Sequence, residues 1–292
     1  MRDFQNTDAD THDAATRLVN AMFLSPSEDE FQTVKNRIDG VKNWMESRGN
    51  INNGLNKKKP YLFCGDSWAI RQDMDSQMKD KNGEKMVHES DGKPFRIKDS
   101  KDLRKAHKKV AKELGTKEKK IYPYWSPAIN AYFFDRSYSD DPKKGGCDLE
   151  DVLGFTFHHD SISGIVLCDK SFTGVRLHQK EVFPLSKDTF ENYGGKINDY
   201  PSTRIEDVLP AARTLYHELF HLYWGADLYP NGGEEYKFRK LTNDKKFTTQ
   251  QAMSNPENYV LQAVAYDYTL SVTTKSKFYP VEFYTGFATY TK

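Results

Sequence analysis

The sequence predicts an α+β fold, and three features of the residue pattern support that prediction. Apolar residues recur every three or four positions near both ends of the chain, which is the period of an amphipathic helix. Short apolar and β-branched runs lie between these regions and are typical of strands. The 292 residues are enough to bury a substantial core, and no stretch has the composition of a linker. We therefore expect a single domain over residues 1–292.

The upstream portion, about residues 1–120, is polar and is predicted to be mostly helical. Residues 11–48 predict two helices separated by Ser25-Pro26-Ser27. Residues 103–114 predict an exposed amphipathic helix within a stretch, residues 101–120, that carries nine Lys or Arg against three acids. Because aromatic residues do not interleave these cations, we interpret the run as a solvated face and not as a nucleic-acid site.

The downstream portion, about residues 121–292, begins with a predicted small sheet. Residues 122–134 are aromatic and suit a buried extended segment. Residues 152–158 and 164–168 have the short apolar pattern of strands. We expect this sheet to precede the helices of the last third of the chain.

Two packed helices are predicted after the sheet. The first covers residues 205–224, where apolar residues repeat at three and four positions and Pro210 lies in the first turn. The second begins near Pro256, because Ser254 and Glu257 have the spacing of a capping box.

Composition and charge exclude several classes of partner. No apolar run approaches the roughly 18 residues that a membrane span needs. The 43 basic and 42 acidic residues leave a formal net charge of +1, so no overall field attracts nucleic acid or an anionic membrane. We therefore expect neither a nucleic acid nor a membrane as partner.

Three cysteines allow at most one disulfide and leave one thiol. We expect Cys147 to pair with Cys168, because the two are close in sequence and flank a predicted strand, with Cys64 pairing to either as the alternative. A secreted protein with one bridge and a cytosolic protein with none both fit this count.

An H-E-x-x-H motif, His217-Glu218-Leu219-Phe220-His221, lies inside the helix predicted over residues 205–224. Residues four positions apart lie on the same helix face, so both imidazoles are expected to face one metal ion. Glu218 lies about 100° around the helix from His217, within reach of a metal-bound water but outside the ligand set. The motif predicts a Zn²⁺ site with His217 and His221 as ligands and Glu218 as general base.

A catalytic zinc held by two histidines requires a third protein ligand. We favour Asp227, because Gly225 allows the chain to turn back toward the metal. Glu234 and Glu235, in the glycine-containing loop that follows, are the first alternatives. The remaining candidates are Asp244 and the cluster His158-His159-Asp160.

This set of motifs resembles the deuterolysin or aspzincin family of fungal zinc metalloendopeptidases, as a divergent member. The resemblance is carried by the H-E-x-x-H motif, by Gly225-Ala226-Asp227-Leu228-Tyr229 and by Asn255-Pro256-Glu257-Asn258-Tyr259. That family has a G-T-x-x-D-x-x-Y-G loop, which supplies an Asp ligand and a Tyr, and a later N-A-D-x-Y helix. Here Ala226 replaces the Thr, and Asp227, Tyr229 and Tyr236 depart from the usual spacing.

The resemblance implies a zincin-like fold, secretion, and hydrolysis of protein or peptide substrates by a metal-activated water. Tyr229 or Tyr236 is then expected to stabilise the oxyanion. Zinc-scavenging and allergen-like relatives carry Arg in place of the motif's Glu, so the presence of Glu218 favours catalysis. The alternative is a noncatalytic secreted zinc-binding or host-interaction protein on the same fold. We expect a monomer, and the first residues show no signal-peptide pattern.

Overall fold

The computed structural model divides the chain into two compact units, which we describe separately. Unit 1 comprises Met1–Lys59 and Lys170–Lys292, and unit 2 comprises Pro60–Asp169. Among the residues that the structure describes, no helix is both long enough and apolar enough to cross a membrane. The described residues are 9–47, 60–136, 144–159, 162–172, 203–210, 212–228, 233–242, 245–271 and 281–289.

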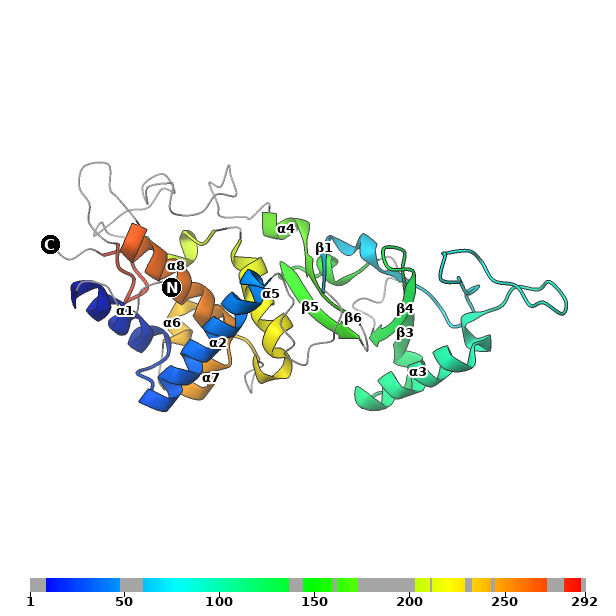
Figure 1. Cartoon of the computed structure of the whole chain (residues 1–292), viewed down its shortest axis with the longest axis horizontal. Coiled ribbons are helices and arrows are strands. Elements are labelled where there is room, and N and C mark those ends of the chain that lie inside the picture. Colours follow the sequence, from blue (N-terminus) through cyan, green and yellow to red (C-terminus); the bar gives the residue numbers. More distant parts are fainter. Residues whose placement is uncertain are drawn as a thin grey trace. The chain divides into compact units, whose positions relative to one another are not determined.

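Unit 1 is built from helices (Figure 1). The longest helix of its C-terminal part is α8, which packs against α1, α5 and α7, while α2 packs against α5 and α7. The helices are α1 (Ala9–Met22), α2 (Glu28–Glu46), α5 (Arg213–Trp224), α6 (Phe238–Leu241), α7 (Thr249–Met253) and α8 (Pro256–Ser271), and the short α4 (Asp169–Phe172) lies at the sequence boundary of the two units.

The break between α1 and α2 has a local cause. Leu24 and Ser25 adopt positive φ values of 59° and 54°, which end α1. Ser27 then caps α2, because its hydroxyl accepts from the backbone N–H of Glu30 while the Glu30 carboxylate accepts from the backbone N–H of Ser27. The predicted pair of helices is confirmed.

Helix α5 is shorter than the sequence suggested. Residues 205–207 form a separate 3₁₀ turn, and the α-helix begins only at Arg213. The expectation of a helix from residue 205 was wrong, because Pro210 disfavours a helical conformation at the residue before it. The end of the helix at Trp224 is as expected, since Gly225 follows with a φ of +56°.

Helix α8 begins at Pro256, in agreement with the sequence, but its start is not the expected capping box. Ser254 is the C-terminal cap of α7, and the Glu257 carboxylate contacts the imidazole of His217. The carboxylate of the capping pattern is therefore used for a tertiary contact.

Unit 2 contains two three-stranded sheets with an aromatic core. One sheet has the order β1-β6-β5, with β1 parallel to β6 and β5 antiparallel to β6; the other is an antiparallel β2-β3-β4 sheet. The indole of Trp68 stacks on Phe133 of one sheet at 5.0 Å and on Phe157 of the other at 4.4 Å, so it joins the two sheets. The elements are β1 (Tyr61–Cys64), β2 (Ile70–Arg71), α3 (Lys101–Glu113), β3 (Ile121–Ser126), β4 (Ala131–Arg136), β5 (Gly154–His159) and β6 (Ile162–Leu167).

Several further expectations are confirmed in unit 2. Helix α3 and strands β5 and β6 lie where the sequence placed them, and residues 122–134 form the β3–β4 hairpin. Cys147 and Cys168 are bonded with an S–S distance of 2.03 Å, and Cys64 is an exposed free thiol. The expectation that residues 60–100 are mostly helical was wrong. This stretch instead forms β1, β2 and isolated bridges. The chain is an α+β protein, and a single domain over residues 1–292 stays a prediction.

Candidate metal centre

The two histidines of the H-E-x-x-H motif lie on one face of α5, inside unit 1. Their side chains are buried, with 6% of His217 and 4% of His221 exposed, and their ring centroids are 5.1 Å apart. Glu218, between them in sequence, is also buried at 6% exposure. The helical period thus brings both imidazoles to one point, as the motif predicts.

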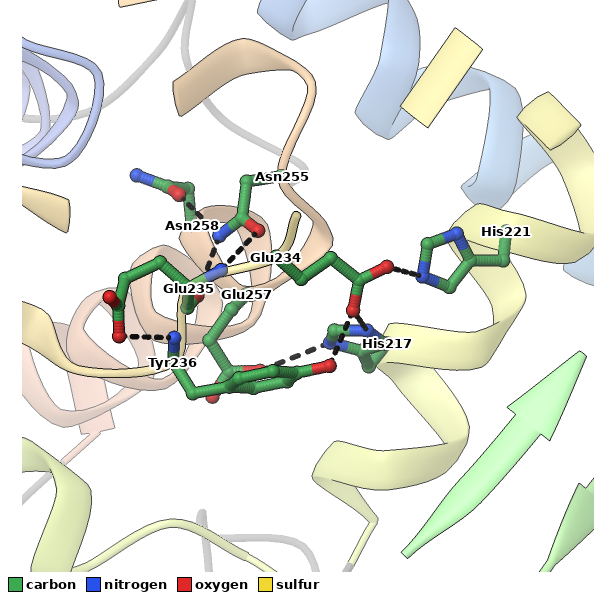
Figure 2. Close-up of polar contacts among 8 residues, drawn as sticks. All are labelled: His217, His221, Glu234, Glu235, Tyr236, Asn255, Glu257 and Asn258. Carbon is green, nitrogen blue, oxygen red and sulfur yellow. Dashed lines mark hydrogen bonds and ion pairs between the residues drawn. The ribbon is translucent and has the colours of Figure 1, made fainter. Parts of the chain in front are cut away.

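A carboxylate from outside the helix completes this point. Glu234 comes from the extended segment that precedes α6, and its two oxygens face the two imidazoles (Figure 2). Its Oε1 lies 2.9 Å from Nε2 of His221, and its Oε2 lies 3.3 Å from Nε2 of His217. One ligand atom from each of the three residues lies within 4.8 Å of the others.

This donor set fits a zinc ion by chemistry and by spacing. Two imidazole nitrogens and one carboxylate oxygen are a known ligand set of catalytic zinc. Donors about 2.0–2.1 Å from a tetrahedral ion are about 3.3 Å from one another, which is close to the two nitrogen–oxygen distances observed. His217, His221 and Glu234 are therefore suited to hold the metal.

Glu257 of α8 fixes the orientation of the first imidazole. Nδ1 of His217 donates a hydrogen bond to Oε2 of Glu257 at 3.1 Å, and both side chains are buried. With a proton held on Nδ1 by Glu257, Nε2 is the nitrogen that faces Glu234 and is left to bind a metal ion. A carboxylate behind a metal-ligating histidine is the usual partner of such sites.

The charges of the cluster stabilise a cation at this point. Burial alone would lower the pKa of His217, but hydrogen bonds with Glu234 and Glu257 outweigh burial and raise it to about 10, with the charges of Glu257 and then Glu218 adding to the increase. Burial alone would raise the pKa of Glu234, but hydrogen bonds from the two histidines lower it well below its usual range. A proton or a metal ion is therefore favoured between these groups.

Tyr236 covers one side of the cluster. Its ring stacks on the imidazole of His217 at 5.6 Å, and its hydroxyl donates to Oε2 of Glu234. Burial of the hydroxyl, together with this hydrogen bond, raises the pKa of Tyr236, although 53% of the residue is exposed. The phenol therefore remains protonated, and in this structure it donates its hydrogen bond to Glu234.

The segment that carries Glu234 is held by the side chain of Asn255. Its Oδ1 accepts from the backbone N–H of Glu235 at 3.2 Å, and its Nδ2 donates to the backbone carbonyl of Glu235 at 2.9 Å (Figure 2). Nδ2 also donates to Oδ1 of Asn258 at 2.8 Å, and Asn258 in turn donates to the carbonyl of Met22. Asn255 is fully buried, so one carboxamide connects the ligand segment to α8.

The structure separates the candidate third ligands. Glu234, an alternative in the sequence, joins the cluster, whereas Glu235 forms an ion pair with Lys240 at 2.8 Å. Asp227 lies in the 3₁₀ turn Gly225–Leu228, but its side chain is outside the described part of the chain, so its role stays a prediction.

Other expected site residues lie elsewhere. Tyr229 and Asp244 are outside the described residues, as are Asp160 and the side chain of His159. His158 is exposed on β5 in unit 2, where its Nδ1 lies 2.9 Å from Oγ of Ser163.

Sequence reasoning missed two contributors to the site, Asn255 as the anchor of the ligand segment and Glu257 as the partner of His217. Both belong to Asn255-Pro256-Glu257-Asn258 at the start of α8. A signal was present, because these polar residues cap and form the first turn of an otherwise apolar helix, where their side chains have to be buried with partners.

No family model, no curated protein and no solved structure matches this chain.

Proposed function

We propose that this protein is a zinc-dependent endopeptidase on a zincin-like fold. The observation that carries the proposal is the convergence of His217, His221 and Glu234 next to Glu218, which combines three metal-binding atoms with a buried carboxylate in the position of a general base. We propose Glu234 as the third ligand, since it already lies within hydrogen-bonding distance of both imidazoles.

The residues of the site divide the chemistry among them. When bound, Zn²⁺ supplies Lewis-acid polarisation of the scissile carbonyl and activation of water. Glu218 accepts a proton from the attacking water and returns it to the leaving amine. The hydroxyl of Tyr236, released from Glu234 when that carboxylate binds the metal, donates a hydrogen bond to the developing oxyanion. Glu257 keeps the Nδ1 proton on His217.

We further propose that the protein acts outside the cell as a monomer on protein or peptide substrates. The Cys147–Cys168 disulfide supports this location, because such bonds persist in oxidising compartments. The resemblance to secreted fungal metalloendopeptidases points in the same direction.

The Glu218→Gln variant tests the division of labour. We expect the wild-type chain to hold about one zinc per molecule and to cleave an unfolded protein. Glu218→Gln is expected to retain the zinc and lose most of the cleavage, because it removes the base but no ligand. Loss of zinc with cleavage intact would contradict these roles.

The same two measurements identify the alternative, a noncatalytic zinc-binding or host-interaction protein. That protein would bind zinc without cleaving any unfolded substrate, and Glu218→Gln would then change neither property.

A further inference from the structure

We propose that the exposed face of α3 in unit 2 binds a sulfated polysaccharide. Helix α3 belongs to unit 2 and the candidate metal centre to unit 1, and the proposal does not depend on the function proposed for that centre. It concerns a row of cationic side chains, which we name the α3 cationic stripe. The stripe consists of Lys101, Arg104, Lys105, Lys108 and Lys112.

The helical period aligns these cations. At about 100° per residue, the five side chains fall within an arc of about 100° and extend over about 16 Å of helix. All five are exposed, and none forms an ion pair or a side-chain hydrogen bond with another described residue. The acids of the helix, Asp102 and Glu113, lie at one flank of the arc, and Glu113 is paired with Lys109 at 3.7 Å.

The opposite face of α3 is anchored to the protein. Leu103, Ala106 and Val110 of that face pack against a cluster formed by Ala111, Ile121 and Phe134, the last two from the β3–β4 hairpin. Nε2 of His107 lies 3.0 Å from the carbonyl of Glu118 and 3.1 Å from that of Ile121, which holds the following turn against the helix. The stripe is therefore presented on a fixed support, so little ordering of the helix is needed when it binds a ligand.

Charge complementarity defines the ligand as a linear polyanion. Unpaired cations repeated along one line match anionic groups repeated along a chain, and binding then releases the counterions of that chain. The formal net charge of the whole protein is only +1, so this attraction is local to the stripe.

Two observations favour a polysaccharide over other polyanions. No aromatic residue occurs in α3, so the stripe has no platform for stacking bases of single-stranded nucleic acid. The Cys147–Cys168 disulfide, in the same unit, indicates an oxidising compartment, where sulfated polysaccharides are the polyanions available rather than nuclear or cytosolic nucleic acids. A membrane surface is also disfavoured, because the apolar face of α3 is already buried and cannot insert among lipids.

The test is binding of the full-length chain to heparin fragments of defined length. Wild type is expected to bind, with an affinity that falls steeply as salt is added. Replacing all five residues of the stripe by Gln keeps good helix formers in α3 and is expected to weaken binding roughly ten- to a hundredfold and to flatten the salt dependence. A wild-type chain that does not bind heparin overturns the proposal.

A matched control separates the stripe from net charge. It carries five Lys→Gln changes at exposed lysines outside α3 and is expected to bind within about twofold of wild type. An equal loss in both variants would show that only total charge matters and would overturn the proposal. The control positions are Lys81, Lys85, Lys144, Lys245 and Lys246.

Two further probes distinguish the class of polyanion. Wild type is offered duplex DNA and phosphatidylserine vesicles at the same concentration of anionic groups, and tighter binding to either one refutes the assignment to a polysaccharide. Circular dichroism checks the fold of each variant. If the five-site variant does not fold, Lys105→Gln combined with Lys108→Gln is expected to reduce the salt dependence of heparin binding, and an unchanged dependence counts against the stripe.

Discussion

Removing the carboxamide of Asn255 is expected to weaken zinc binding although Asn255 is not a ligand. The side chain makes three hydrogen bonds, two with the backbone of Glu235 and one with Asn258. In Asn255→Ala all three are lost in a fully buried environment. At about 1 kcal/mol for each bond, the two bonds to Glu235 give a loss of about 2 kcal/mol in the attachment of the segment that carries Glu234.

The consequence for the metal follows from the position of Glu235, which is directly joined to Glu234. Once the backbone of Glu235 is released, the Glu234 carboxylate is no longer fixed opposite the two imidazoles. We expect zinc affinity to fall roughly ten- to a hundredfold, the usual effect of removing a group that supports a ligand. Asn255→Asp should be equally harmful, because its carboxylate keeps the acceptor but lies against the carbonyl oxygen of Glu235.

The assay is competition for zinc between the protein and a chromogenic chelator, with thermal unfolding measured in parallel. Thr269→Val is the control on α8, because it removes the side-chain hydrogen bonds from Thr269 Oγ1 to the carbonyl of Ala265 at 3.0 Å and to that of Val281 at 3.3 Å. It should lower stability by about 1 kcal/mol and leave zinc affinity unchanged. A folded Asn255→Ala protein with wild-type zinc affinity would refute the positioning role.

Three further outcomes are expected. When zinc content is measured, the Glu234→Ala protein should lose the metal and the Glu235→Ala protein should keep it. If instead Asp227→Ala loses the zinc and Glu234→Ala keeps it, Asp227 is the third ligand, as the sequence first suggested. Glu257→Gln should reduce zinc affinity roughly tenfold, since the neutral amide is a weaker acceptor for the Nδ1 proton of His217, and an unchanged affinity would argue against that role. Burial and, as a smaller cause, the charge of Asp135 raise the pKa of Tyr124 to about 12, above its unfolded value of about 10. The contribution of the neutral Tyr124 to stability should therefore be full below pH 10 and be lost between about pH 10 and 12. Tyr124→Phe should unfold less steeply over that range when followed by circular dichroism, and an unaltered profile would exclude Tyr124 as the cause.

The parts of the site that could be predicted are those set by local periodicity. His217 and His221 are four residues apart on one helix, so their convergence depends only on the helical period. The end of α5 was likewise predictable, because Gly225 tolerates the positive φ that stops the helix. Both conclusions need no knowledge of distant contacts.

The position of Glu234, the proposed third ligand, depends on a contact that sequence spacing does not encode. Gly225 shows that the chain leaves the helix axis but does not give the direction in which it continues. The path to Glu234 is set by the pairing of Glu235 with Asn255, which is 20 residues away, and Asn255 is itself placed by α8. The sequence-based choice of Asp227 considered only the nearest acid after Gly225, and sequence spacing could not show the long-range pairing that places Glu234 beside the histidines.

The balance of charge at the centre gives a reason for a metal that is independent of the motif. Glu218, Glu234 and Glu257 bring three carboxylates to a largely buried place occupied by two imidazoles. With neutral histidines the formal charge is −3, and burying such charge without compensation is costly. Protonation of one histidine changes the formal charge to −2. One Zn²⁺ changes it to −1 and leaves both Nε2 atoms to bind the metal. A divalent cation therefore compensates the negative charge of this cluster better than a proton on one histidine does. Removal of a bound metal should accordingly lower the stability of unit 1 as well as abolish the proposed activity.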